Sequence, residues 1–63
     1  MKKKYELWAD NSKEASELFG ALTKKLGKEN ITLISTAAHD PVLVNPGGIF
    51  YEGEGYIRSI FEI

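Results

Sequence analysis

The feature that most constrains this fold is an amphipathic stripe between two strand-like segments. Asn11 followed by Glu14 fits a capping box at the start of the stripe, and Ser12 is a second candidate cap. Gly27 stands where a left-handed C-terminal cap is expected. The spacing i, i+3, i+4, i+7 and i+11 predicts an α-helix with one apolar face. The apolar residues of that face are Ala15, Leu18, Phe19, Leu22 and Leu26.

Strand patterns lie on both sides of this helix. Residues 4–9 alternate, with three apolar side chains on one side and Glu6 and Trp8 on the other. Residues 31–36 are rich in β-branched side chains, which favour strands. A strand, a helix and a second strand form a βαβ unit, so we expect the two strands to be parallel. The helix then covers one face of the sheet.

The next segment reads as a β-hairpin. Residues 42–44 are all apolar, and residues 49–51 return after Asn45-Pro46-Gly47-Gly48. Proline at the second position and Gly47 at the third position are typical of a type II turn. The two segments are therefore expected to pair as antiparallel third and fourth strands.

The C-terminal segment is predicted to be a short helix. Within residues 56–63, the apolar side chains have helical spacing, whereas strict alternation would bury Ser59. A fifth strand is the alternative reading. We expect three residues of the helix to pack beside Leu18 and Leu22. They are Ile57, Ile60 and Phe61.

Size and composition limit the class of protein. Sixty-three residues allow one domain, spanning 1–63, and the sequence has no cysteine for a disulfide or a thiolate metal site. Eight Lys and Arg against nine Asp and Glu give a net charge of −1, which argues against binding to phosphate backbones as the main role. No stretch approaches the length of a membrane span, so we expect a cytoplasmic protein.

Short motifs suggest a known family. Pro41-Val42-Leu43-Val44 resembles the proline-led third strand of thioredoxin-like and glutaredoxin-like domains. Residues 53–57, which begin with Gly53, resemble the family's glycine-led entry into its last helix. Residues 5–9 and 13–22 resemble its first strand and helix. The resemblance implies a minimal α/β fold of order β-α-β-β-β-α, a four-stranded mixed sheet with two helices on one face. It also implies a cis bond between Asp40 and Pro41.

The sequence departs from that family in two places. Where the family carries C-x-x-C, this chain has Asp10-Asn11-Ser12, and it contains no cysteine. Thiol–disulfide exchange needs a thiolate, so dithiol redox catalysis by this chain is excluded. The helix between the second strand and the proline is also missing, and residues 37–40 replace it. We therefore expect a redox-inactive domain without enzyme activity or a cofactor.

Four polar residues are expected to gather near the carboxyl ends of the first two strands. Ligands of α/β sheets bind at such ends, so Asp10, Asn11, His39 and Asp40 are a candidate polar site for a metal or an anion. The alternative is a turn in which these side chains cap backbone groups. We favour the turn and assign no metal ligand and no catalytic residue.

The missing helix leaves one sheet face open. Alternation assigns this face Glu6 and Trp8 and, from the second strand, Thr32, Ile34 and Thr36. Tryptophan is enriched at the energetic centres of interfaces, so we predict association through this face, most simply as a homodimer or otherwise with another protein. The alternative is a solvated face on which a single exposed tryptophan has no binding role.

A second function class is nucleic-acid binding. Three lysines at positions 2–4 stand close to Tyr5 and Trp8, a combination found in single-strand binders. Glutamates balance the other lysines, so this reading ranks below a non-enzymatic interaction or assembly module.

Overall fold

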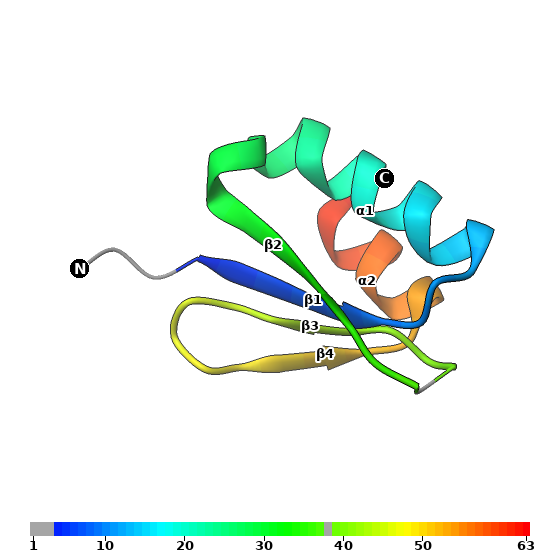
Figure 1. The fold of residues 1–63 in the computed structure, drawn as a ribbon. Coiled ribbons are helices and arrows are strands. Elements are labelled where there is room, and N and C mark those ends of the chain that lie inside the picture. Colours follow the sequence, from blue (N-terminus) through cyan, green and yellow to red (C-terminus); the bar gives the residue numbers. More distant parts are fainter. Residues whose placement is uncertain (1–3, 38) are drawn as a thin grey trace.

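A computed structural model describes residues 4–37 and 39–63 (Figure 1). The fold is α/β, with a mixed sheet of four strands and two helices that both lie on one face of it. This confirms the predicted fold class. Along the chain the elements are β1 (Tyr5–Ala9), α1 (Lys13–Leu26), the 3₁₀ turn η1 (Lys28–Asn30), β2 (Ile31–Ser35), β3 (Val42–Val44), β4 (Phe50–Glu52) and α2 (Glu54–Phe61).

The strand order is β2-β1-β3-β4, so β1 is central and β2 and β4 are the edges. β1 runs parallel to β2, with Trp8 opposite Ile34, as the βαβ pattern predicts. β3 lies antiparallel on the other side of β1 and pairs Val42 with Trp8. β4 completes the hairpin with Tyr51 opposite Leu43. The fourth strand thus starts one residue later than the predicted 49–51.

The core lies between the helices and one face of the sheet. Burial is complete or nearly so for eight apolar residues, and no polar or charged side chain is buried among the described residues. Because α1 and α2 are on the same side, the second sheet face contributes nothing to this core. The buried residues are Leu7, Ala9, Ala15, Leu18, Leu22, Ile31, Leu43 and Ile57.

Local polar contacts set the ends of α1. Ser12 is the N-cap, because its hydroxyl oxygen accepts a hydrogen bond of 3.1 Å from the backbone N–H of Ala15. The prediction of a capping box that starts at Asn11 is therefore wrong, and the second candidate cap, Ser12, is confirmed. At the other end the N–H of Gly27 donates to the carbonyl of Thr23 at 2.8 Å. Gly27 has a φ of 94°, as a glycine cap requires, although its ψ of 133° lies outside the left-handed helical region.

The C-terminal segment is helical, as predicted, and the strand alternative is wrong. α2 follows Gly53, whose φ of 95° suits glycine. Ile57 is fully buried, and the Phe61 ring meets Tyr5 and Tyr51 edge-on at centroid distances of 5.9 and 6.0 Å. The prediction for Ile60 is wrong, because its side chain is 39% exposed. Phe61 is four residues after Ile57 and lies on nearly the same face of the helix. Ile60 is three residues after Ile57 and is displaced by about 60° around the helix axis.

The hairpin turn differs from the type II prediction. The N–H of Gly48 donates to the carbonyl of Asn45 at 2.9 Å, so the turn closes where expected. However, Gly48 has a positive φ of 93°, whereas Gly47 does not have one. The side-chain oxygen of Asn45 accepts a further bond of 2.9 Å from the N–H of Ile49. This contact fixes the return of the chain into β4.

The predicted cis bond before Pro41 is wrong. No cis peptide occurs among the described residues, so Asp40 and Pro41 are joined in trans. Trans is the cheaper isomer of a bond before proline by about 0.5–1 kcal/mol. The carbonyl of Pro41 accepts a hydrogen bond of 2.9 Å from Gly53, which extends the β3–β4 ladder by one step. Pro41 therefore enters the sheet as an ordinary strand end.

Candidate functional site

The sheet face opposite the helices carries the residues predicted for it, together with several others. Residues paired across neighbouring strands point to the same face, and successive residues alternate. Glu6 and Trp8 of β1 thus share a face with their partners on β2 and β3, while Leu7 and Ala9 point into the core. We call this surface the open face. It consists of Glu6, Trp8, Thr32, Ile34, Val42, Val44, Phe50 and Glu52, together with Thr36, which follows β2 and lines the same hollow as Trp8.

The centre of the open face is apolar and hollowed. Trp8, Val42, Val44 and Phe50 line an open hollow of about 380 Å³, with Glu6, Thr36 and Asp40 at its margin. Trp8 is 40% exposed and Phe50 is 64% exposed. Two large aromatic side chains and two valines therefore form a contiguous apolar surface that nothing in the described chain covers. Such patches mark contact sites more often than single exposed residues do.

The Trp8 ring is held along its own strand. Its indole N–H donates a hydrogen bond of 3.1 Å to a carboxylate oxygen of Glu6, two residues earlier. This contact gives the one polar atom of the indole a partner within the chain. What Trp8 offers to another molecule is therefore apolar ring surface.

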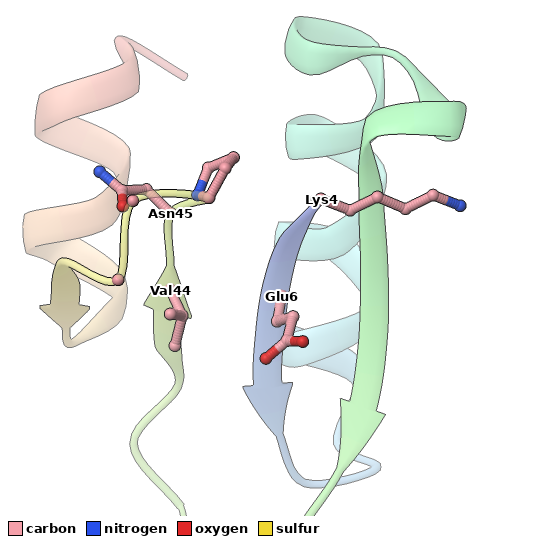
Figure 2. A pocket seen from close by; sticks show the side chains of 7 residues that line it. Lys4, Glu6, Val44 and Asn45 are labelled. Carbon is pink, nitrogen blue, oxygen red and sulfur yellow. The ribbon is translucent and has the colours of Figure 1, made fainter. Parts of the chain in front are cut away.

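A second hollow of about 390 Å³ lies at the other end of β1, beside the hairpin turn (Figure 2). Lys4, Glu6 and Val44 line one part of it, and residues 45–48 line the rest. Figure 2 shows the Lys4 side chain extending away from the turn, so its ammonium group does not point at the glycine backbone. No nucleophile and base converge among these lining residues, and the hollow extends the open face toward the turn.

The predicted polar loop site is only partly assembled. His39 Nδ1 lies 3.3 Å from a carboxylate oxygen of Asp10, and the His39 side chain is 97% exposed. The other Asp10 oxygen accepts a hydrogen bond of 3.1 Å from the backbone N–H of Ser12. Hydrogen bonds from Ser12, followed by the nearby His39, hold the pKa of Asp10 below its usual value. These contacts are typical of a turn that leads into a helix.

The other two residues of that site make different contacts. The Asn11 side-chain oxygen accepts a hydrogen bond of 3.1 Å from the hydroxyl of Ser35, which ties the first loop to the end of β2. Asp40 lies at the margin of the Trp8 hollow. Within the part of the chain that the structure describes, no three His, Cys, Asp or Glu residues could hold a metal ion together.

Four open-face residues were missed by the sequence reasoning: Val42, Val44, Phe50 and Glu52. The strands that carry them have three residues each, too few to show alternation. The hairpin itself was the available signal, because once Leu43 faces the core, its neighbours and their partners must face away.

Comparison with protein-family models, with curated proteins and with solved structures finds no match to this chain. The resemblance to thioredoxin-like domains therefore stays a prediction.

Proposed function

We propose that this protein is a non-enzymatic interaction module that associates with a second copy of itself through the open face, as a symmetric homodimer. The observation that carries the proposal is the uncovered apolar centre formed by Trp8, Val42, Val44 and Phe50. Twofold pairing lets one such patch cover its own equivalent on the other copy, and it is the commonest form of assembly.

Association would also supplement a small core. Apolar surface taken out of water contributes about 25 cal/mol per Å², and the sheet here buries only its helix-covered face. Chains of this length bury about 60% of their unfolded surface and are marginal alone. A partner that binds the folded state alone adds its binding free energy to the stability of the fold.

Charge supports a protein partner over a nucleic acid. Glu6 and Glu52 belong to the open face, and Asp40 lies at its margin, whereas Lys4 is the one described lysine near it. Phosphate backbones bind through cations, so three carboxylates beside the aromatic residues disfavour them. Lys2 and Lys3 lie outside the described residues. Nucleic-acid binding is therefore the weaker alternative.

The proposal includes a thioredoxin-like ancestry and a cytoplasmic location. The element order β-α-β-β-β-α and the absence of cysteine support a redox-inactive member of that family, while the trans bond before Pro41 counts against it. Within residues 4–37 and 39–63, neither helix is long and apolar enough to cross a membrane.

Sedimentation equilibrium from micromolar to millimolar concentration tests the proposal. We expect the wild type to associate and Trp8→Ala to weaken association by roughly 30-fold, the cost of losing an interface hot spot worth about 2 kcal/mol. Tyr56→Ala is the matched control, because Tyr56 is an exposed aromatic on α2, away from the open face. A wild type that stays monomeric throughout, with Trp8 fluorescence typical of full exposure, would contradict the proposal.

Oligonucleotide binding measured across a salt series addresses the alternative. Binding that weakens steeply with salt and is lost in Trp8→Ala would favour a nucleic-acid role over the dimer. Absence of binding at low salt would remove that role.

A further inference from the structure

The hollow at the centre of the open face combines aromatic rings with carboxylates. Trp8 and Phe50 both line it, and each leaves much of its surface uncovered, at 40% and 64% exposure. Glu6 and Asp40 lie at its margin, whereas no lysine or arginine of the described chain lines it. The hollow therefore offers apolar ring surface and negative charge at one place.

The sheet register explains why these groups meet. Val44 of β3 pairs with Glu6 on one side and with Phe50 on the other. Paired residues on neighbouring strands point to the same face, with Cβ atoms about 4.5–5.5 Å apart. These three residues thus form one row across the sheet, and Trp8 and Val42 form the next row along it. The rings and the Glu6 carboxylate are therefore positioned by paired strands.

One hydrogen bond joins the two kinds of group. Trp8 Nε1 donates to Glu6 Oε1 at 3.1 Å, which holds the carboxylate beside the indole. A carboxylate has two oxygens with about four acceptor positions, so Glu6 can accept from a second donor as well. Neither Glu6 nor Asp40 forms an ion pair with any residue in the described ranges. The charge at the margin of the hollow thus suits a cation from another molecule.

We infer that this hollow binds an arginine side chain presented by a basic segment of another protein. A guanidinium group is planar, so it stacks on an aromatic ring while its N–H groups donate to a carboxylate. Tryptophan is the aromatic residue that binds cations best. The guanidinium is also more weakly hydrated than an ammonium, which lowers the cost of its contact with the two valines.

The shape of the hollow favours a side chain over a free small molecule. Small-molecule pockets usually enclose most of their ligand, whereas this hollow of about 380 Å³ is open on the sheet surface. A side chain carried by a larger partner needs only its tip to be covered. This binding goes beyond the proposed homodimer, because a single copy suffices for it. Both uses cover Trp8, so an arginine peptide should dissociate the dimer.

Fluorescence tests the binding directly, because Trp8 is the only tryptophan in the chain. The full chain is titrated with the capped peptide Gly-Gly-Arg-Gly-Gly and with counterparts that carry citrulline or lysine instead of arginine. Citrulline keeps the shape of arginine without its charge. We expect a saturable change in Trp8 emission with the arginine peptide, and binding of the citrulline peptide that is weaker by at least about fivefold. The lysine peptide should also bind more weakly, because an ammonium group does not stack.

Substitutions show whether the peptide binds at the hollow. Glu6→Gln keeps an acceptor for the indole N–H but removes the charge, so it should weaken binding by roughly two- to fivefold. Asp40→Asn and Phe50→Ala should each weaken binding as well, since one removes a carboxylate and the other a ring. Glu17→Gln is the matched control, because it makes the same change in net charge at an exposed position of α1, which covers the opposite face (Figure 1).

The outcomes separate this inference from the homodimer. Equal binding of the arginine peptide and either counterpart would overturn it, as would equal weakening by Glu6→Gln and Glu17→Gln. Trp8 emission that responds to protein concentration or to an oligonucleotide, but not to the arginine peptide, would overturn it in favour of a second copy or a nucleic acid. A wild type that stays monomeric and binds the arginine peptide would support it while contradicting the homodimer.

Discussion

At the scale of single residues, short polar contacts decide where the elements begin. Asp10 and Ser12 together close the turn between β1 and α1, since Asp10 accepts from the N–H of Ser12 and Ser12 accepts from that of Ala15. The same pair explains why the polar loop resembles a binding site in sequence. The Asp10 carboxylate and the Ser12 hydroxyl already accept hydrogen bonds from backbone N–H groups at the start of α1.

Replacement of this cap should destabilise the fold measurably. We expect Ser12→Ala to lower the free energy of unfolding by about 1 kcal/mol, because one backbone N–H of the first turn loses its acceptor. Ser16→Ala is the control, an exposed serine inside the same helix with no side-chain hydrogen bond of this kind. Urea denaturation followed by circular dichroism measures both. A Ser12→Ala midpoint equal to that of Ser16→Ala would contradict this role.

At the scale of elements, α2 shows how one turn of helix separates core from surface. Ile57 is fully buried against the leucines of α1, and Phe61 extends the same stripe onto Tyr5 and Tyr51. Ile60, between them in sequence, lies to the side of that stripe and remains 39% exposed. The helix therefore contributes one row of side chains, Ile57 and Phe61, to the core.

Two isoleucines of α2 therefore form a matched pair of variants. Ile57→Ala should cost about 2–5 kcal/mol, the range for truncating a fully buried side chain, and this could unfold a chain of 63 residues. Ile60→Ala should cost less than about 1 kcal/mol, because much of its side chain is already in water. Chemical denaturation of both variants at one concentration checks the difference. Equal destabilisation would show that α2 is rotated from its described position.

At the scale of the whole molecule, the sheet is finished on one side only. Both helices cover the same face, and the open face with its hollow is left to solvent or to a partner. The open face is thus the apolar surface of this small domain that is available for association.

Association should make thermal stability depend on concentration. For a dimer that dissociates as it unfolds, a tenfold rise in protein concentration adds about 1.4 kcal/mol per mole of dimer. We expect the wild-type melting temperature to rise by a few degrees over that range. The Trp8→Ala variant, whose association through the open face is weakened, should show a smaller rise over the same range. A wild-type midpoint that does not move with concentration would argue for a monomer.

Much of the fold could be predicted from local patterns in the sequence. The apolar stripe of α1, the alternation of β1 and the helical spacing of α2 are periodicities that a single segment carries by itself. They also placed Trp8 and Glu6 on the uncovered face. Gly27 and Gly53 were marked by position, and both adopt the positive φ that favours glycine. Such features depend on backbone geometry that is the same in any fold.

What the tertiary structure alone decided depends on pairing between distant segments. The register of β3 and β4 against β1 brought Val42, Val44 and Phe50 beside Trp8 and turned a lone tryptophan into an apolar patch. The strand order made β1 central and left β2 and β4 as the edges of the sheet. A short strand has no periodicity to report which way it faces, so its partners determine that.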